Sequence, residues 1–167
     1  MTDSQMQQGQ QWLKSLLQIM DVSADVTQSQ PQPLESSVTE PDNYWLTIDE
    51  TDLTPEQTQV LIGSQGTVLD AIQYLANAIL NLNQTPEQQI FYTVELNGYR
   101  VRRQAEIQAI ASSTALQVRS SGQEVEIKSL SSAERRQVHT FLKDFPDLET
   151  FSRGKEPHRH LVVRLQK

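Results

Sequence analysis

The chain of 167 residues contains no cysteine. Disulfide bridges, thiolate zinc sites, iron–sulfur clusters and cysteine nucleophiles are therefore excluded. No apolar run approaches the roughly 18 residues that a membrane-spanning helix needs. The N-terminus, Met1 to Gln11, is rich in glutamine and lacks the basic and then apolar pattern of a signal peptide. We therefore expect a cytoplasmic protein that does not insert into a membrane itself.

Recognisable catalytic motifs are missing as well. The sequence has no Gly-x-Ser-x-Gly elbow, no P-loop lysine and no dinucleotide fingerprint. His158 and His160 alternate on an expected strand, but no third histidine or nearby carboxylate stands at ligand spacing. The sequence therefore predicts no catalytic residue, no metal site and no cofactor, and the protein is not expected to be an enzyme.

Basic residues are scarce in the first half of the chain. The net charge is -7, which argues against nucleic acid as a ligand, because phosphates are neutralised by lysine and arginine. The charge is uneven, however: residues 1–56 carry ten acidic residues and one basic residue, whereas residues 98–167 carry thirteen basic residues and eight acidic ones. This asymmetry indicates that the C-terminal side contacts a polyanion; the alternative is two ordinary solvated surfaces.

The hydrophobic pattern predicts two small α+β units rather than one sheet with a single core. The expected helices cover residues 10–20, 55–62, 67–80, 99–118 and 131–144. Thr67 with Asp70 and Ser131 with Glu134 have the spacing of capping boxes for two of these helices. The expected strands cover residues 24–30, 44–48, 90–96, 125–128, 148–152 and 161–165.

The segment Gly63-Ser64-Gln65-Gly66 joins two of these helices. Its glycines would let backbone N–H groups approach a sugar-phosphate chain, and the following helix adds partial positive charge at its N-terminus. A GxxG loop that clamps about four nucleotides is typical of KH domains. An ordinary interhelical turn is the alternative, but the order helix, strand, strand, helix, GxxG, helix, strand favours a type II KH domain.

A second candidate site lies in the basic C-terminal part. Arg135 and His139 are four residues apart on one expected helix, so both side chains share a face and suit phosphate binding. The later hairpin adds candidate phosphate ligands, namely Thr150, Ser152, Arg153, Lys155 and Arg159. The alternatives are an exposed, solvated pair and a soluble hairpin tip.

Four segments in this order resemble the Jag family, also called SpoIIIJ-associated proteins. They are Leu61 to Asn77 around the GxxG loop, Tyr99-Arg-Val-Arg-Arg103, Glu134-Arg-Arg-Gln-Val-His139 and Thr150 to Arg159. Members are bacterial RNA-binding proteins with a KH domain followed by an R-3-H domain, named for an arginine and a histidine separated by three residues. The resemblance covers about residues 43–167 and the helix at 10–20.

The resemblance implies an α+β fold in which a type II KH domain (αββααβ) is joined by a long helix to a small R-3-H domain. We expect a disordered polar N-terminus at residues 1–9, the KH domain at 10–97 with a flexible loop at 31–42, a bridging helix at 98–121, and the R-3-H domain at 122–167. Two departures stand out: the neutral Ser64 and Gln65 replace the basic residues that the family often has there, and the chain is expected to be a short form without a further N-terminal domain.

The implied function is single-stranded RNA binding, with a role in post-transcriptional regulation linked to cell growth or division. Single-stranded DNA is a candidate ligand too, and a small single-KH protein is a candidate partner. Arg100, Arg102 and Arg103 are candidate auxiliary contacts. The alternative function is a protein-interaction module whose KH surface docks another KH protein or the membrane-insertion machinery. Changing Gly63 and Gly66 to aspartate is expected to weaken RNA binding without unfolding the protein.

Overall fold

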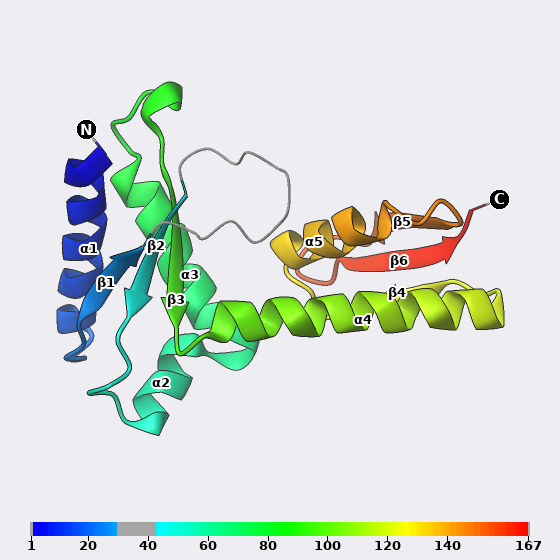
Figure 1. Ribbon diagram of the computed structural model, residues 1–167, viewed down its shortest axis with the longest axis horizontal. Coiled ribbons are helices and arrows are strands. Elements are labelled where there is room, and N and C mark those ends of the chain that lie inside the picture. The colour runs from blue at the N-terminus through cyan, green and yellow to red at the C-terminus, as the bar shows by residue number, and fades with distance from the viewer. Residues whose placement is uncertain (1, 30–42, 167) are drawn as a thin grey trace. The chain divides into compact units, whose positions relative to one another are not determined.

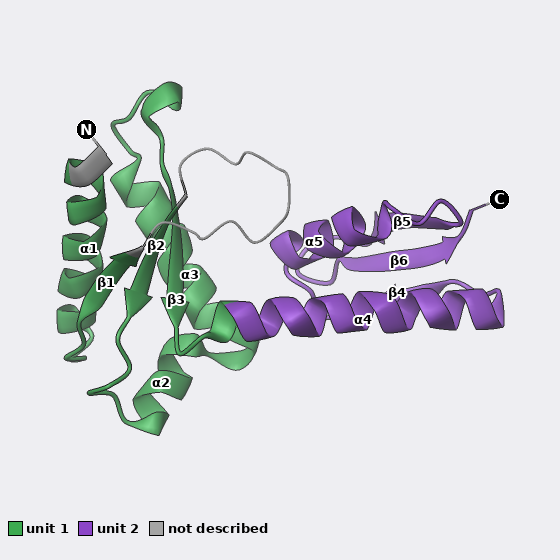
Figure 2. Ribbon diagram, in the orientation of Figure 1, with its two compact units in different colours: residues 1–100 green, residues 101–167 purple. Residues whose placement is uncertain are grey.

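A computed structural model describes residues 2–29 and 43–166 of the chain (Figure 1). The chain divides into two compact units, Met1–Arg100 and Val101–Lys167, called unit 1 and unit 2 below (Figure 2). The loop predicted at residues 31–42 lies outside the described residues. Within the described ranges, no helix has the length and apolar character needed to cross a membrane.

Unit 1 has the element order predicted for a type II KH domain. Its elements are α1 (Thr2–Ile19), β1 (Val26–Ser29), β2 (Asn43–Ile48), α2 (Pro55–Ile62), a 3-10 turn (Ser64–Gly66), α3 (Thr67–Leu80), a second 3-10 turn (Pro86–Gln88) and β3 (Phe91–Leu96). The strands lie in the order β1-β2-β3, with β1 antiparallel and β3 parallel to the central β2. The predicted α+β fold class is therefore confirmed.

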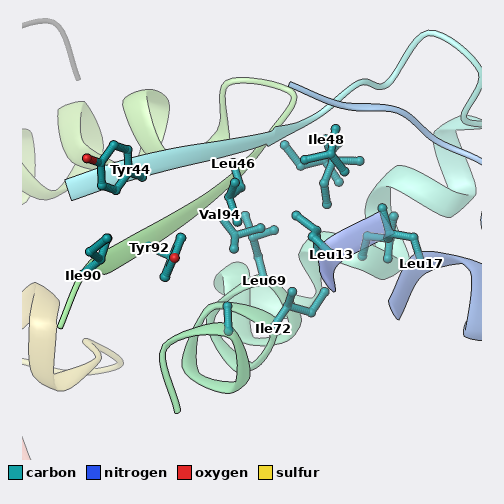
Figure 3. Packing of buried hydrophobic residues seen from close by; sticks show 14 residues of the cluster. Leu13, Leu17, Tyr44, Leu46, Ile48, Leu69, Ile72, Ile90, Tyr92 and Val94 are labelled. Atoms are coloured by element: carbon teal, nitrogen blue, oxygen red, sulfur yellow. The ribbon is translucent and has the colours of Figure 1, made fainter. Parts of the chain in front are cut away.

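Helices α1 and α3 bury their apolar faces against this sheet. Leu13 and Leu17 of α1 meet Leu46 of β2 and Leu69 of α3 in one core, and all four side chains are fully buried (Figure 3). Burying a leucine side chain contributes about 1.5–3 kcal/mol, so this core holds α3 firmly on the sheet. The GxxG loop, which directly precedes α3, is thereby anchored at one end.

The N-terminal segment is helical, so the prediction of a disordered segment at residues 1–9 is wrong for residues 2–9. Tertiary contacts explain the difference. The Tyr92 hydroxyl donates a hydrogen bond to the Gln5 carbonyl at 3.0 Å, and Gln5 Nε2 donates to the Gln88 carbonyl at 3.2 Å. A Cβ at Gly9 would lie 2.6 Å from the Tyr92 ring, so only glycine permits this close approach. The glutamine-rich composition of the segment gave no indication of these tertiary contacts.

The free edge of β3 is closed by side-chain amides of α3. Asn77 Nδ2 donates to the Tyr92 carbonyl and Asn77 Oδ1 accepts from the Tyr92 amide, both at 2.8 Å. Asn81 bonds in the same way to Ile90, at 2.8 and 2.9 Å. Four helical residues rise about 6.0 Å and two strand residues about 6.6 Å, so asparagines four apart match alternate residues of the strand. This strand edge is therefore not open to pairing with another strand.

Unit 2 contains most of α4 (Tyr99–Ser121), then β4 (Val125–Ile127), α5 (Ser132–Leu142), β5 (Leu148–Arg153) and β6 (His160–Leu165). Its sheet has the order β4-β6-β5, with both pairings antiparallel. Buried Ile107 and Ala111 of α4 pack in one core with Val138 of α5 and Leu161 of β6. The second unit therefore includes α4 from Val101 onward, rather than beginning at residue 122 after a separate bridging helix.

Helix capping follows the sequence prediction at α5 but not at α3. At α5 the Ser131 hydroxyl accepts from the Glu134 amide at 3.2 Å, and Glu134 Oε2 accepts from the Ser131 amide at 2.8 Å. At α3 the N-cap is Gly66, without a side-chain cap, so the capping box predicted from Thr67 and Asp70 is wrong. Asp70 instead forms an ion pair with Arg100.

Candidate nucleic-acid interface

The GxxG loop of unit 1 turns through left-handed backbone conformations. Gly63, Gln65 and Gly66 have φ angles of 74°, 53° and 78°. Ser64 and Gln65 are exposed, whereas Gly66 is buried. The backbone N–H groups of Ser64 and Gln65 have no hydrogen-bond acceptor in the described part of the chain. They are therefore available to an anion beside the N-terminus of α3.

Both glycines of the loop are required sterically. A Cβ at Gly66 would lie 2.5 to 2.7 Å from atoms of the Tyr99 ring, and a Cβ at Gly63 would lie 2.5 Å from Val68 Cγ2. Aspartates at both positions are therefore expected to strain the loop, in contrast to the expectation that they leave the fold unaffected. Substitutions at the two exposed positions between the glycines are a cleaner test of the loop.

Arg100, predicted as an auxiliary contact, is a structural residue of unit 1. Its guanidinium donates to the Val94 carbonyl at 3.1 Å and to Gln73 Oε1 at 3.1 Å, and it forms an ion pair with Asp70. Gln73 Oε1 also accepts from the Val94 amide at 3.0 Å, so the two side chains extend the closed edge of β3. The side chain of Arg100 is only 20% exposed. Its donors are engaged within unit 1.

Arg102 and Arg103 differ in their surroundings. Arg103 is 17% exposed in its side chain and contacts Glu134 at 2.7 Å and Glu106 at 3.1 Å, so its charge is compensated within unit 2. Arg102 is exposed on α4. Of the three candidate auxiliary residues, only Arg102 is at the surface.

The arginine of the Arg-x-x-x-His pair is buried. Arg135 Nη1 donates to the Leu130 carbonyl at 2.9 Å and to the Arg159 carbonyl at 3.1 Å, and Nη2 forms an ion pair with Glu156. Its side chain is 7% exposed. Its donors therefore fasten the turn between β5 and β6 to the start of α5.

His139 is exposed and directly contacts Thr150, which the sequence also indicated as a candidate phosphate ligand. Its Nδ1 forms a hydrogen bond with the Thr150 hydroxyl of β5. The structure thus brings His139 and Thr150 together, as the sequence suggested. Ser152 follows two residues later on β5, is exposed, and lies on the same face of the strand as Thr150.

Arg153 lies on the opposite face of the sheet. Strand alternation places it with Phe151, and its guanidinium lies 5.3 Å from the centre of the Phe151 ring. It also bonds to Glu124 at 2.9 Å and to Glu126 at 3.1 Å. The hydrogen bond from Arg153 lowers the pKa of the Glu124 carboxyl below its ordinary value. Arg153, predicted as a phosphate ligand, is therefore compensated by Glu124 and Glu126.

The uncompensated positive charge of unit 2 collects around α5. All acidic side chains of its described residues except Asp144 form ion pairs with basic side chains. Exposed basic side chains without an ion pair to any described residue remain at Arg136, Lys143, Lys155 and Arg159. Arg136 was not among the residues predicted from the sequence, although its spacing of three residues from His139 places it on the same flank of α5.

Six residues define the candidate interface, which we call the basic rim: Arg136, His139, Thr150, Ser152, Lys155 and Arg159. Arg136 and His139 lie on α5, the hydroxyl residues on β5, and Lys155 and Arg159 in the turn that Arg135 fastens. Guanidinium, ammonium, imidazole and hydroxyl groups are all donors to phosphate oxygens. The rim therefore has the chemistry of a phosphate-binding surface.

The chain is similar to known proteins. Residues 105–165 match the R-3-H domain family. Three proteins, each called RNA-binding protein KhpB, are similar: that of Lactiplantibacillus plantarum is 33% identical over 108 residues, that of Clostridium symbiosum 30% over 108 residues, and that of Bacillus subtilis 31% over 113 residues. These alignments cover 65%, 65% and 66% of this chain, and 33%, 48% and 53% of the relatives. The chain thus matches from a third to about half of the length of each relative.

Proposed function

The chain belongs to the Jag family, and from this premise we propose that it binds single-stranded RNA through the basic rim and the GxxG loop. The observation that carries the proposal is the distribution of charge in unit 2. Most of its charges cancel in pairs, whereas Arg136, Lys143, Lys155 and Arg159 are exposed and have no ion pair with a described residue. Uncompensated cations provide most of the sequence-independent affinity for nucleic acid.

The proposed contacts go to the backbone of the nucleic acid rather than to its bases. The rim has no phenylalanine, tyrosine or tryptophan, and its one aromatic ring is the small imidazole of His139; Phe151 lies on the other face of β5, near the guanidiniums of Arg153 and Arg164. Sequence-tolerant binding through bases needs exposed aromatic rings for stacking. The rim therefore positions the strand, and the N–H groups of the GxxG loop add a second, weaker set of backbone contacts.

The rim is tested by the salt dependence of RNA binding. Each phosphate contact adds about -0.7 to the slope of log K against log salt for a single strand. Changing Arg136, Lys155 and Arg159 to glutamine is therefore expected to reduce the slope by about 2 and to weaken binding strongly at about 50 mM salt. Fluorescence anisotropy with a randomised single-stranded RNA pool measures both quantities.

The matched control removes the same charge elsewhere on unit 2. Arg119, Lys128 and Arg164 are exposed or half-buried and paired with carboxylates, so changing all three to glutamine should leave the slope close to that of the wild type. Equal loss in both triple variants would show that only net charge matters and would refute the rim. A folded wild type that binds no RNA at low salt would refute the function itself.

The loop is tested with Ser64→Asp and Gln65→Asp together. Two carboxylates beside the free N–H groups repel phosphate, so we expect binding to weaken about 3- to 10-fold. Asparagine at the same two positions is the control, because it has the same shape and also tolerates the left-handed conformation of Gln65. Equal binding by the aspartate and asparagine variants would remove the loop from the interface.

The same proposal extends to a role in post-transcriptional regulation linked to cell growth or division, as the family suggests. Transcripts that co-purify with the wild type after crosslinking in cells, and are lost with the rim variant, would support it. The same transcripts recovered with both proteins would contradict it.

A further inference from the structure

The short turn between β3 and α4 contains the only Asn-Gly pair of the chain, Asn97-Gly98 (Figure 1). Both residues are exposed, and both have left-handed φ angles, 51° for Asn97 and 65° for Gly98. Glycine and asparagine are the residues that adopt this conformation most readily. The geometry of the turn therefore explains why these two residues stand here, but the pair also has a reactivity of its own.

The side chain of Asn97 can react with the backbone of the residue that follows it. The Gly98 nitrogen attacks Asn97 Cγ, and the new C–N bond closes a five-membered succinimide ring. The bond from Cγ to the side-chain nitrogen breaks, and ammonia leaves with the proton of the Gly98 amide. Water then opens the ring on either side of the nitrogen, which gives aspartate or isoaspartate. Water is the only co-reactant.

The structure leaves the attacking nitrogen accessible. Gly98 has no side chain to hinder the attack, and its N–H group donates no hydrogen bond to a residue that the structure describes. The other asparagines on the helical side of the turn are less suited. Asn77 and Asn81 are fixed to β3 by hydrogen bonds, and the exposed Asn83 is followed by a residue with a bulky side chain.

We propose that Asn97 is a deamidation site, at which the folded protein reacts with water and becomes isoaspartate or aspartate. Asparagine is one of the thermolabile residues of proteins, and exposed turns are the segments in which the backbone moves most freely. The reaction uses only groups of this turn. It is therefore independent of whether the basic rim binds RNA.

The turn is built over a buried carboxylate, which makes its length critical. Glu95 is 5% exposed and accepts hydrogen bonds from the Leu96 amide at 2.7 Å and the Arg100 amide at 3.1 Å. These bonds cap the first turn of α4 and tie it to the end of β3. Isoaspartate inserts one methylene group, or about 1.5 Å of main chain, between the two bonded amides. The start of α4 must then shift or lose its bond to Glu95.

The first turn of α4 also contacts the GxxG loop and α3. Atoms of the Tyr99 ring lie 2.5 to 2.7 Å from the position that a Cβ of Gly66 would occupy, and Arg100 forms an ion pair with Asp70. A shift of Tyr99 and Arg100 therefore loosens the loop. The aspartate product keeps the length of the backbone, and a carboxylate just before a helix is tolerated. Isoaspartate, and not aspartate, is thus the product that disturbs the loop.

Peptide mass mapping after incubation of the full chain in mildly alkaline buffer tests the site. We expect the peptide that contains Asn97 to gain the mass difference between O and NH, at a rate within about tenfold of that in the chain unfolded by denaturant, because an exposed turn opens at little cost. A protein isoaspartyl methyltransferase should then methylate the isoaspartate product, which distinguishes it from aspartate.

Asn97→Gln is the matched control. Glutamine would have to close a six-membered ring, which forms far more slowly, and Gln65 with a φ of 53° shows that this chain accommodates a glutamine in the left-handed conformation. This variant should gain no mass at position 97. The exposed Asn83 is the control within the wild type and should also stay unchanged.

Hydrogen exchange tests the effect on the loop. The amides of Arg100, which donates to Glu95, and of Gly66, which donates to the Gly63 carbonyl at 3.3 Å, should exchange at least about tenfold faster in the isoaspartate form. Asn97→Asp carries the charge without the added methylene group and should exchange like the fresh wild type. Equal acceleration in both would overturn the role of main-chain length.

A folded protein that gains no mass at Asn97 while the unfolded chain is converted would overturn the inference. Equal conversion of Asn83 and Asn97 would do the same, because the turn would then confer no selectivity. Neither mass mapping nor hydrogen exchange involves RNA, so these outcomes are distinct from a failure of the RNA-binding proposal.

Discussion

Changing Arg135 to methionine is expected to lower the free energy of unfolding of unit 2 by about 2–4 kcal/mol. Methionine fills similar space but leaves the Leu130 and Arg159 carbonyls without the guanidinium donor. An unpaired buried polar group costs about 1–3 kcal/mol. The ion pair with Glu156 adds less, because that carboxylate is 60% exposed and screened by water.

Both tryptophans and all four tyrosines of the chain lie in residues 1–100, so their fluorescence does not report on unit 2. Hydrogen exchange of the amides in β5 and β6 is the suitable measurement, and exchange should accelerate by the factor that corresponds to the lost stability. Arg136→Met is the neighbouring control. Because Arg136 is exposed and has no ion pair with a described residue, its replacement should weaken RNA binding but leave exchange unchanged.

The two variants separate a positioning role from a direct contact. If Arg135→Met weakened RNA binding as Arg136→Met does and left exchange rates unchanged, Arg135 would contact phosphate directly. We instead expect Arg135→Met to affect RNA through Lys155 and Arg159, whose turn it fastens. Arg135→Lys should restore little of the stability that Arg135→Met loses, since an ammonium group lacks the planar fork that reaches both carbonyls.

The burial of Arg135 was readable in the sequence. It stands three and seven residues before Val138 and Leu142, which are buried on the same face of α5. The spacing of Arg135 and His139 predicted that the two side chains share a face of the helix. Residues four apart on a helix nevertheless differ by about 40° in direction around its axis. That difference is enough to bury one side chain and expose the other at the edge of the apolar face.

The order of the helices and strands was predictable because it depends on short-range features of the sequence, namely the period of the hydrophobic residues and the positions of turn-forming residues. The segment Pro55–Ile62 and the strands of both sheets follow from such patterns. The sealed edge of β3 was not predictable in this way. Asn81 suggests the end of a helix when seen in sequence, whereas its bonds to Ile90 exist only because α3 lies beside β3. Long-range pairing of this kind leaves no local signal.

The residues of the basic rim were also only partly predictable from local sequence patterns. Strand alternation predicts that Thr150 and Ser152 share one face and Arg153 the other. Which face meets α5 depends on the core, where Leu148 is buried with Val138 and Leu142. The sequence therefore predicted the segment that carries the hydroxyl groups, but it did not show that Arg153 lies on the other face of the sheet from them.

Replacing Gly66 by alanine is expected to lower the free energy of unfolding of unit 1 by about 2–3 kcal/mol. Two causes act together. A left-handed φ of 78° costs an alanine about 1 kcal/mol, and the added Cβ would lie 2.5 to 2.7 Å from the Tyr99 ring, which must then leave its place against the core. Denaturant unfolding followed by the fluorescence of Trp12 and Trp45 measures the loss in unit 1.

Gly122→Ala in unit 2, followed by hydrogen exchange because fluorescence does not report on this unit, separates the two causes. Gly122 has a similar φ of 68°, but no atom lies within 4 Å of its added Cβ, so only the conformational cost of about 1 kcal/mol should remain. In unit 1, combining Gly66→Ala with Tyr99→Leu should cost less than the sum of the single changes, because the smaller side chain relieves the contact. If the two alanine variants lost equal stability, the contact between Gly66 and Tyr99 would contribute nothing, and the loop would owe its shape to backbone conformation alone.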